Sequence, residues 1–209
     1  GIEAAIISSP TGVHLPQAVE LAEAGIHLLI EKPLSYSLEH ISDLEKVVLN
    51  KKLVVLVGYV LRFDPCAVRF KELLESDFIG DLLSVKIECG SYLPDWRPDQ
   101  DYRKTVSAIP ELGGGVLLEL SHELDYMNWF FGKPSDVQAK LRNSKTLELD
   151  VEDQANMIFT GENGIPISMH LDFCRRHTQR ECVAQTTEGE LAWNAVKKQV
   201  KWKPYNANE

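Results

Sequence analysis

Glu119, His122 and Asp125 are the residues of this chain best suited to proton transfer, and they follow three consecutive glycines at intervals of three. The apolar pattern of residues 116–131 predicts a helix, in which this spacing places the three side chains on one face. An imidazole beside carboxylates accepts and releases protons near neutral pH. The segment therefore predicts a proton-handling cluster directly after a glycine-rich turn.

A second group of candidate residues follows two short apolar runs near the N-terminus. Residues 4–7 and 27–30 predict buried strands, and Pro16 and Gly25 suit the first turn and the end of a helix between them. A strand, helix and strand within about 30 residues form a parallel crossover unit, whose ligands gather beyond the carboxyl ends of the strands. The residues at these two ends are Ser9 and Pro10, and Glu31, Lys32 and Pro33.

Two further elements extend this unit. Ser37 is expected to cap a helix whose apolar stripe runs from Leu38 to Val48. Residues 53–57 predict a third buried strand, because they form a short, continuous apolar run. Residues 1–61 are therefore expected to form one parallel α/β domain.

From residue 62 to residue 209 the pattern changes to strands separated by tight turns. An amphipathic helix is predicted at 65–76 and a strand at 82–92. Alternation such as Met157 and Phe159 among polar neighbours predicts an antiparallel, hairpin-connected sheet, with one face packed on helices and the other left for a partner. The later strands are predicted at 136–142, 153–160, 165–173, 181–187, 190–194 and 199–202.

The sequence resembles the Gfo/Idh/MocA oxidoreductases. The matching motifs are Ser-Ser-Pro-Thr-Gly-Val-His at 8–14, Ala-Gly-Ile-His-Leu-Leu-Ile-Glu-Lys-Pro at 24–33, Gly-Tyr-Val-Leu-Arg-Phe-Asp-Pro at 58–65, Ile-Gly at 79–80, and residues 113–125. They follow the order and spacing of that family along nearly the whole chain. The resemblance implies an α/β protein, in which a partial Rossmann domain at 1–61 precedes an α+β domain at 62–209 with an open, mostly antiparallel sheet.

The resemblance also implies an activity, the transfer of hydride between NAD or NADP and a secondary alcohol of a sugar, sugar nucleotide or cyclitol. It implies that Lys32 lies beside the nicotinamide and the substrate, that His122 transfers the proton, and that Glu119 assists. A cis peptide bond before Pro33 is compatible with its place at a strand end. The cofactor-binding residues that the resemblance implies are Ser9, Pro10, His14, Glu31, Lys32, Pro33 and Arg62.

A polar and aromatic loop at 94–103 is the candidate for substrate contact. Tryptophan and tyrosine stack on sugar rings, and arginine grips hydroxyl groups or phosphate. The alternative for this loop is a packed surface segment without a binding role. The residues expected to contact the substrate are Lys32, Trp96, Arg97, Tyr102, His122 and Asp125.

The chain departs from the family pattern in two places. The family's usual aspartate stands four residues before the histidine, whereas here Glu119 stands three before it, which moves the acid by roughly 100° around a helix; this spacing favours polysaccharide or sugar-nucleotide substrates. The glycine-rich phosphate loop and the acid that binds the ribose have no counterpart in the sequence, which leaves NAD versus NADP open. We therefore expect this chain to be a fragment that lacks roughly 70–90 residues and binds the dinucleotide weakly or not at all.

Composition narrows the class of partner. The chain has 209 residues, 44% of them hydrophobic, and a net charge of -9, which argues against nucleic acid. The basic run at 175–180 is interpreted as the exposed side of a strand. The sequence has no apolar stretch long enough to span a membrane, and its four cysteines show no paired spacing, which favours the cytoplasm. The partners that the family resemblance implies are a small sugar-like molecule and further copies of the chain, bound through the open sheet face.

Two other function classes stay open at this point. A metal hydrolase would use Glu119, His122, Glu123 and Asp125, although the sequence lacks a His-Glu-x-x-His motif, and the primary interpretation assigns no metal. A non-catalytic binding or assembly protein that has lost its nucleotide site is the other alternative. Titration of NADH distinguishes this alternative from a dehydrogenase: absence of binding by both this chain and a full-length version favours the assembly protein.

Overall fold

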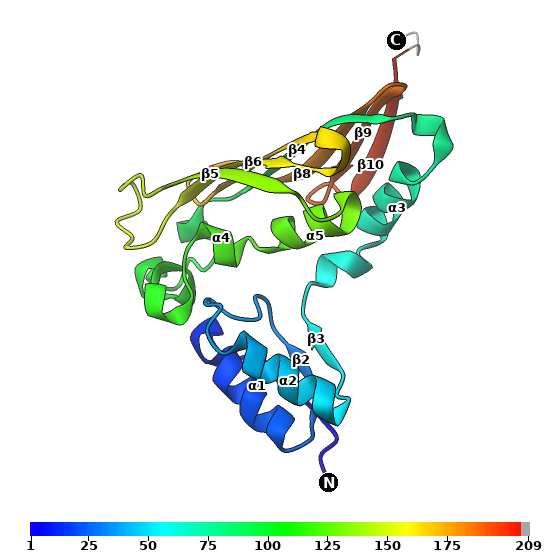
Figure 1. Cartoon of the computed structure of the whole chain (residues 1–209). Coiled ribbons are helices and arrows are strands. Elements are labelled where there is room, and N and C mark those ends of the chain that lie inside the picture. The colour runs from blue at the N-terminus through cyan, green and yellow to red at the C-terminus, as the bar shows by residue number, and fades with distance from the viewer. Residues whose placement is uncertain (206–209) are drawn as a thin grey trace.

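The computed structural model describes residues 1–205, which form two sheets with helices between them (Figure 1). The N-terminal unit contains the parallel strands β1 (Ala4–Ile7), β2 (His27–Ile30) and β3 (Val55–Val57), in that order. Helices α1 (His14–Glu23) and α2 (Ile41–Lys51) lie side by side on one face of this sheet. The predicted parallel α/β unit is thus confirmed.

The strands of the N-terminal unit are buried on one face only, so the prediction of buried strands was wrong for the opposite face. Ile7, Leu28 and Ile30 pack against the helices. The opposite face presents a row of three apolar side chains that are paired across the sheet and exposed to 72%, 40% and 59%. These three residues, which we call the apolar row, are Ile6, Leu29 and Leu56.

Helix α2 begins later than the sequence predicted. Ser37 does not cap it; its hydroxyl accepts a hydrogen bond from the amide of Glu39 within the preceding turn. The helix starts after His40, whose backbone is left-handed (φ 61°). Leu38 is consequently outside the helix and exposed, and the apolar stripe starts at Ile41. By contrast, Gly25 ends α1 with φ 82°, as predicted.

The second unit is built on a seven-stranded sheet with the order β10-β9-β8-β4-β7-β6-β5. All its neighbouring strands are antiparallel except β4 and β7, which pair in parallel, so the predicted hairpin between β7 and β8 was wrong, because these two strands do not pair with each other. The reason is that β4 inserts between β7 and β8, which are themselves antiparallel to each other. The strands are β4 (Leu82–Gly90), β5 (Asp136–Arg142), β6 (Gln154–Thr160), β7 (Pro166–Asp172), β8 (Gln179–Thr186), β9 (Gly189–Asn194) and β10 (Gln199–Pro204).

Helices α3 (Pro65–Leu74), α4 (Val116–Glu119) and α5 (His122–Phe131) cover one face of this sheet, on the side of the N-terminal unit (Figure 1). Met157 and Phe159 are buried there, as their alternation predicted, and the opposite face is open. The domain boundary at residue 61 stays a prediction; the two sheets lie on either side of it. Single 3-10 turns lie at Thr11–Val13, Val60–Phe63, Asp77–Ile79, Leu93–Asp95, Tyr102–Lys104, Val106–Ala108, Pro110–Leu112 and Glu162–Gly164.

The segment after the glycines forms two short helices, not the single helix predicted. Helix α4 ends at Glu119 and Leu120 leaves the helical conformation (φ -97°, ψ 30°). At its start, the amide of Leu117 donates to a carboxylate oxygen of Glu152, which fills the space that a side chain at Gly115 would need. Glu119 and His122 therefore belong to different helices and do not share one helix face.

The glycine turn also joins the two units. Gly113 has φ 85°, and a Cβ atom there would lie 2.8 Å from Cβ of Thr11 in the N-terminal unit. Only glycine fits both the backbone and the contact. The turn thus fixes the start of α4 against the segment that follows β1.

Candidate active site

A cavity of about 520 Å³ lies where the N-terminal unit meets the helices of the second unit, and Lys32 and His122 both line it. Lys32 follows β2, whereas His122 is the first residue of α5. Glu119, at the end of α4, lines the same cavity. The structure therefore brings together the three residues predicted to be catalytic, from three separate elements.

Lys32 is held by Glu119 in two ways. Its Nζ atom donates to the main-chain oxygen of Glu119 at 2.9 Å and lies 3.5 Å from the Oε2 atom. The hydroxyl of Ser107 donates to the other carboxylate oxygen of Glu119. The peptide bond between Lys32 and Pro33 is cis. Glu119 thus orients the lysine, despite the shortened spacing to the histidine.

His122 is buried on one side and has an uncharged ring at neutral pH. Burial lowers its pKa from 6.5 to about 4, and the charges of Arg180 and Lys32 act in the same direction. Its Nδ1 atom is buried and has no hydrogen-bond partner in residues 1–205. The ring meets Tyr59 edge to face at 5.6 Å between centroids. A neutral imidazole in this place can accept a proton from a group in the cavity.

Asp125 and Arg62 bind each other. The guanidinium of Arg62 donates to both carboxylate oxygens of Asp125, each at 2.8 Å. Neither residue belongs to the cavity lining in the described part of the chain. This pair connects the segment after β3 with helix α5.

His14 connects the ends of β1 and β2. Its side chain is buried, and its two ring nitrogens lie 2.9 Å and 2.7 Å from the main-chain oxygens of Pro33 and Ser9. Both nitrogens are thus occupied by the protein. The Ser9 hydroxyl donates to Gln17, and the Glu31 carboxylate accepts from the amide of Lys32.

The residues of the aromatic loop line two different pockets. Trp96 lines the cavity, with its indole N–H donating to the Ser91 hydroxyl at 2.7 Å. Arg97 and Tyr102 instead line a separate pocket of about 10 Å³, which is too small for a sugar, although Trp96 also borders it. The Tyr102 hydroxyl donates to the main-chain oxygen of Leu147. Of the three predicted residues, only Trp96 is placed beside Lys32 and His122.

Arg180 lines the cavity and was missed from the sequence as a site residue. The interpretation of the basic run at 175–180 as the exposed side of a strand was wrong for Arg180, which donates through Nε to the buried carboxylate of Glu123 at 2.7 Å, whereas Arg176 and His177 are exposed. Cys182 and Ala184 on the same strand are fully buried. Since strand side chains alternate, their positions place residue 180 on the inner face as well.

The residues proposed for a metal hydrolase are engaged in other contacts. Glu123 pairs with Arg180, Asp125 with Arg62, and Glu119 with Lys32. Within residues 1–205, no group of three or more His, Cys, Asp or Glu side chains is arranged to hold a metal ion. The structure therefore offers this alternative no ligand set in the described residues.

Two family models match the chain. One, the GFO/IDH/MocA C-terminal domain, matches residues 67–192; the other, the oxidoreductase family with an NAD-binding Rossmann fold, matches residues 1–59. The chain belongs to this oxidoreductase family. None of the helices described in residues 1–205 has the length and apolar character needed to cross a membrane.

The similar proteins include several sugar dehydrogenases. The uncharacterized oxidoreductase YrbE of Bacillus subtilis is 34% identical over 78% of this chain and 46% of its own length. Levoglucosan dehydrogenase of Pseudarthrobacter phenanthrenivorans is 30% identical over 65% of this chain and 34% of its own. The chain spans about half the length of the first of these relatives.

The solved structures show the same fold. An inositol dehydrogenase homolog from Azotobacter vinelandii, complexed with NAD+, superimposes with a TM-score of 0.89 at 18% identity, covering 100% of this chain and 56% of that chain. Levoglucosan dehydrogenase in complex with NADH and levoglucosan gives 0.87 at 22% identity, covering 99% and 58%. The predicted α/β architecture with a mostly antiparallel second sheet is confirmed.

Proposed function

We propose that the protein to which this chain belongs is an NAD(P)-dependent oxidoreductase that transfers hydride to or from a secondary alcohol carbon of a sugar, sugar nucleotide or cyclitol. The observation that carries the proposal is that Lys32 and His122, from different units, line one cavity. The names of similar proteins support the substrate class, since they include a levoglucosan dehydrogenase and a scyllo-inositol 2-dehydrogenase.

His122 is the group that accepts the alcohol proton. Its pKa of about 4 keeps the imidazole neutral at pH 7, so that it is free to take up a proton as the alcohol becomes a carbonyl. Lys32 lies next to it as a cation and stabilises the negative charge that develops on the oxygen. Glu119 is a positioning residue that holds the ammonium group at the cavity wall.

The ends of the parallel strands fit the nicotinamide half of the cofactor. Glu31 and Lys32 follow β2, and Gly58 directly follows β3. A Cβ atom at Gly58 would lie 3.3 Å from a carboxylate oxygen of Glu31, so the two strand ends are in contact. Ligands of parallel sheets bind beyond such carboxyl ends. When bound, NAD(P)+ supplies the hydride acceptor. Of the implied residues, Ser9, Pro10, Glu31, Lys32 and Pro33 are proposed to border it, whereas His14 and Arg62 hold neighbouring segments in place.

The test is an assay of the protein that carries this chain, since the chain spans about half of its relatives. Levoglucosan, myo-inositol and D-xylose are supplied with NAD+ or NADP+, and the absorbance of the reduced cofactor is followed. We expect turnover with at least one of them. Folded protein that binds neither NADH nor NADPH and turns over none of these substrates would instead favour the binding or assembly protein.

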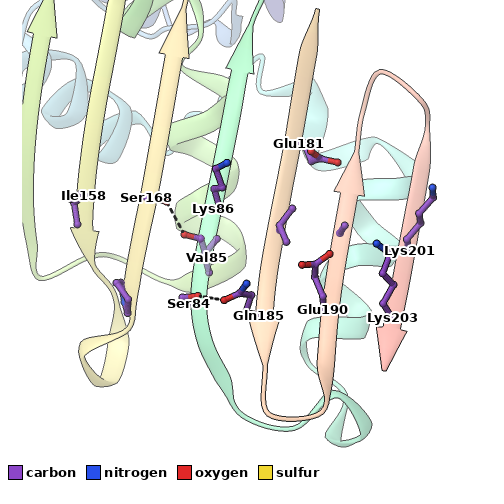
Figure 2. A pocket seen from close by; sticks show the side chains of 13 residues that line it. Ser84, Val85, Lys86, Ile158, Ser168, Glu181, Gln185, Glu190, Lys201 and Lys203 are labelled. Carbon is purple, nitrogen blue, oxygen red and sulfur yellow. Dashed lines mark hydrogen bonds between the residues drawn. The ribbon is translucent and has the colours of Figure 1, made fainter. Parts of the chain in front are cut away.

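We also propose that the open face of the seven-stranded sheet joins two copies of the chain. Figure 2 shows side chains from several strands of this face. They line a hollow of about 650 Å³. Ile158 is exposed among them, and lysines and glutamates lie on the same surface, so that a two-fold related copy can pair opposite charges. The charged residues are Lys86, Glu181, Glu190, Lys201 and Lys203.

Light scattering after size exclusion tests this interface. We expect the mass of a dimer for the unmutated chain and of a monomer for Ile158→Lys, because the new charge would be buried between copies. Leu83→Lys is a control at an exposed position outside the hollow. A monomeric mass for the unmutated chain would refute the interface.

The cytoplasm is the proposed location. Cys66, Cys89, Cys174 and Cys182 are free thiols in the structure. Unpaired thiols are typical of a reducing compartment. Fractionation of cells that produce the complete protein tests this proposal, and recovery in a secreted fraction would contradict it.

A further inference from the structure

A buried ion pair lies directly beneath the cavity. Glu123, in the first turn of α5, is completely buried, and its Oε1 atom accepts from Nε of Arg180 at 2.7 Å. Its other oxygen has no hydrogen-bond partner in residues 1–205. Such a pair usually adds little stability compared with apolar side chains of the same volume. Stability alone therefore does not account for this pair.

The pair fixes one side of the guanidinium group. Nε of Arg180 points to the buried Glu123 carboxylate, while the side chain as a whole remains 27% exposed. The contact with Glu123 uses one of the five N–H donors of the group. The cavity wall therefore includes a guanidinium whose orientation is set from below.

The other charged groups around the cavity are already engaged. Lys32 is bound by Glu119, and Asp64 accepts a hydrogen bond from the amide of Ala67 at the start of α3. The carboxylate partner of Arg180 is in the core and not in the cavity. Arg180 is thus a cation whose outward donors are suited to an oxygen atom of a bound molecule.

Arg180 also lies close enough to His122 for its charge to lower the pKa of the imidazole, after burial, which has the largest effect. Lys32 acts on the same ring. The two cations therefore surround the group to which the alcohol proton is assigned. A sugar placed with one hydroxyl at His122 brings its other oxygens toward them.

We propose that Arg180, positioned by Glu123, is a second substrate-binding cation, which donates hydrogen bonds to an oxygen acceptor of the ring bound beside His122. The acceptor is a hydroxyl or a carboxylate of the substrate. This inference rests on the proposed function, because it assigns the cavity to a sugar. It adds to that function a residue that selects the substrate.

Binding to the 209-residue chain tests the inference without cofactor. The probes are D-glucose, D-glucuronate and myo-inositol, and the dissociation constants are measured by titration of NMR signals. We expect Arg180→Met to weaken the best-bound probe by about tenfold or more, since a charge-assisted hydrogen bond is lost. Arg180→Lys retains part of the affinity, and Glu123→Gln gives a smaller loss because the guanidinium is less firmly oriented.

Arg175→Met is the matched control. Arg175 has a similarly exposed side chain, at 24%, and is also paired with a carboxylate, Asp172, but it does not line the cavity. We expect the Arg175→Met variant to bind the three probes with the same dissociation constants as the unmutated chain. A loss of D-glucuronate binding larger than that of D-glucose identifies the acceptor as a carboxylate, and equal losses identify it as a hydroxyl.

A second measurement separates binding from a structural role. Because the charge of Arg180 lowers the pKa of His122, Arg180→Met is expected to raise the titration midpoint of the His122 imidazole from about 4 toward 6.5, whereas Arg175→Met leaves it unchanged. If the methionine variant does not fold, Arg180→Gln replaces it in both measurements. Folded variants that bind all three probes with unchanged affinity would overturn the inference, whatever the midpoint.

The outcome is distinguishable from failure of the proposed function. Absence of hydride transfer by the complete protein, with sugar binding that still depends on Arg180, would refute the dehydrogenase and leave this residue's role standing. Turnover by the complete protein that is insensitive to Arg180→Met would refute only this inference. Binding of none of the three probes by the unmutated chain would also overturn it.

Discussion

The two sheets of the molecule each leave one face uncovered, and these two faces differ in chemistry. The three-stranded sheet exposes the apolar row of Ile6, Leu29 and Leu56. The open face of the seven-stranded sheet instead mixes lysines and glutamates with isolated apolar side chains. An apolar face is costly in water, whereas a polar face is not. Burial of the apolar row against another element would therefore stabilise the N-terminal unit, whereas the open face of the second unit can remain in contact with water.

The two units also contribute unequally to the site. The second unit supplies Glu119, His122 and Arg180 on elements packed against its large core, whereas the N-terminal unit supplies Lys32. The proposed chemistry thus needs contact between a well-covered unit and a partly covered one. Substitutions in each unit separate their contributions to catalysis and stability.

The first prediction compares one catalytic group from each unit in the complete protein. Lys32→Met and His122→Asn are each expected to lower kcat by about 10²–10⁴-fold, because the cation and the proton acceptor act on the same alcohol. Steady-state kinetics measures both. The double variant should lose much less than the product of the two factors. Independent, multiplicative losses would show that the residues do not share one step.

The second prediction concerns the core of each unit in the 209-residue chain. Phe70→Ala, in the core of the second unit, should cost about 3–5 kcal/mol, and Leu44→Ala, in the N-terminal unit, about 2–5 kcal/mol. Denaturant unfolding measures both free energies. We expect the alanine at 44 to unfold the N-terminal unit while the second unit keeps its structure. Loss of both units in one step would contradict the distinction between them.

Features that depend on the local residue pattern could be predicted from the sequence. Periodicity was sufficient for the strands around Met157 and Phe159, because their alternation reflects burial on one face. The order and spacing of the family motifs were sufficient to predict that Lys32 and His122 lie in one site, and both residues line the same cavity. Both predictions rest on residue types and their spacing along the chain.

Contacts between distant segments were not predictable in the same way. The start of α4 depends on the carboxylate of Glu152, and the position of Asp125 depends on Arg62, from which it is 63 residues away. Arg180 could have been placed inward from the alternation of its strand, but its partner Glu123 lies on another element. The start of α2 was missed because Ser37 offers the same capping group to a turn.

The third prediction tests the contact between the units. Gly113→Ala should destabilise the chain by about 1–3 kcal/mol, because it combines a left-handed backbone with a Cβ atom 2.8 Å from Thr11. Thermal denaturation measures the loss. Gly164→Ala is a control, since it has φ 79° but nothing within 4 Å of the added atom, so it isolates the backbone cost. Equal losses in the two variants would exclude a role for the Thr11 contact.

The fourth prediction, with the smallest effect on stability, concerns the apolar row. Leu29→Thr should reduce aggregation of the 209-residue chain, because it removes exposed apolar surface while keeping a residue favoured in strands. Light scattering as a function of concentration measures this. A matched change on the polar face, Val183→Thr, should have a weaker effect on aggregation. An equal effect would show that the two faces do not differ in solution.

The most direct test of the shared cavity is the protonation of His122 in the 209-residue chain, followed by NMR of its imidazole. The account predicts a midpoint of about 4, because the ring is buried beside Arg180 and Lys32, and a higher midpoint in Lys32→Met, because one of these charges is removed. Lys46→Met, a change of an exposed lysine on α2, should leave the midpoint unchanged. A midpoint near 6.5 that does not respond to Lys32→Met would place the two residues apart and contradict the account.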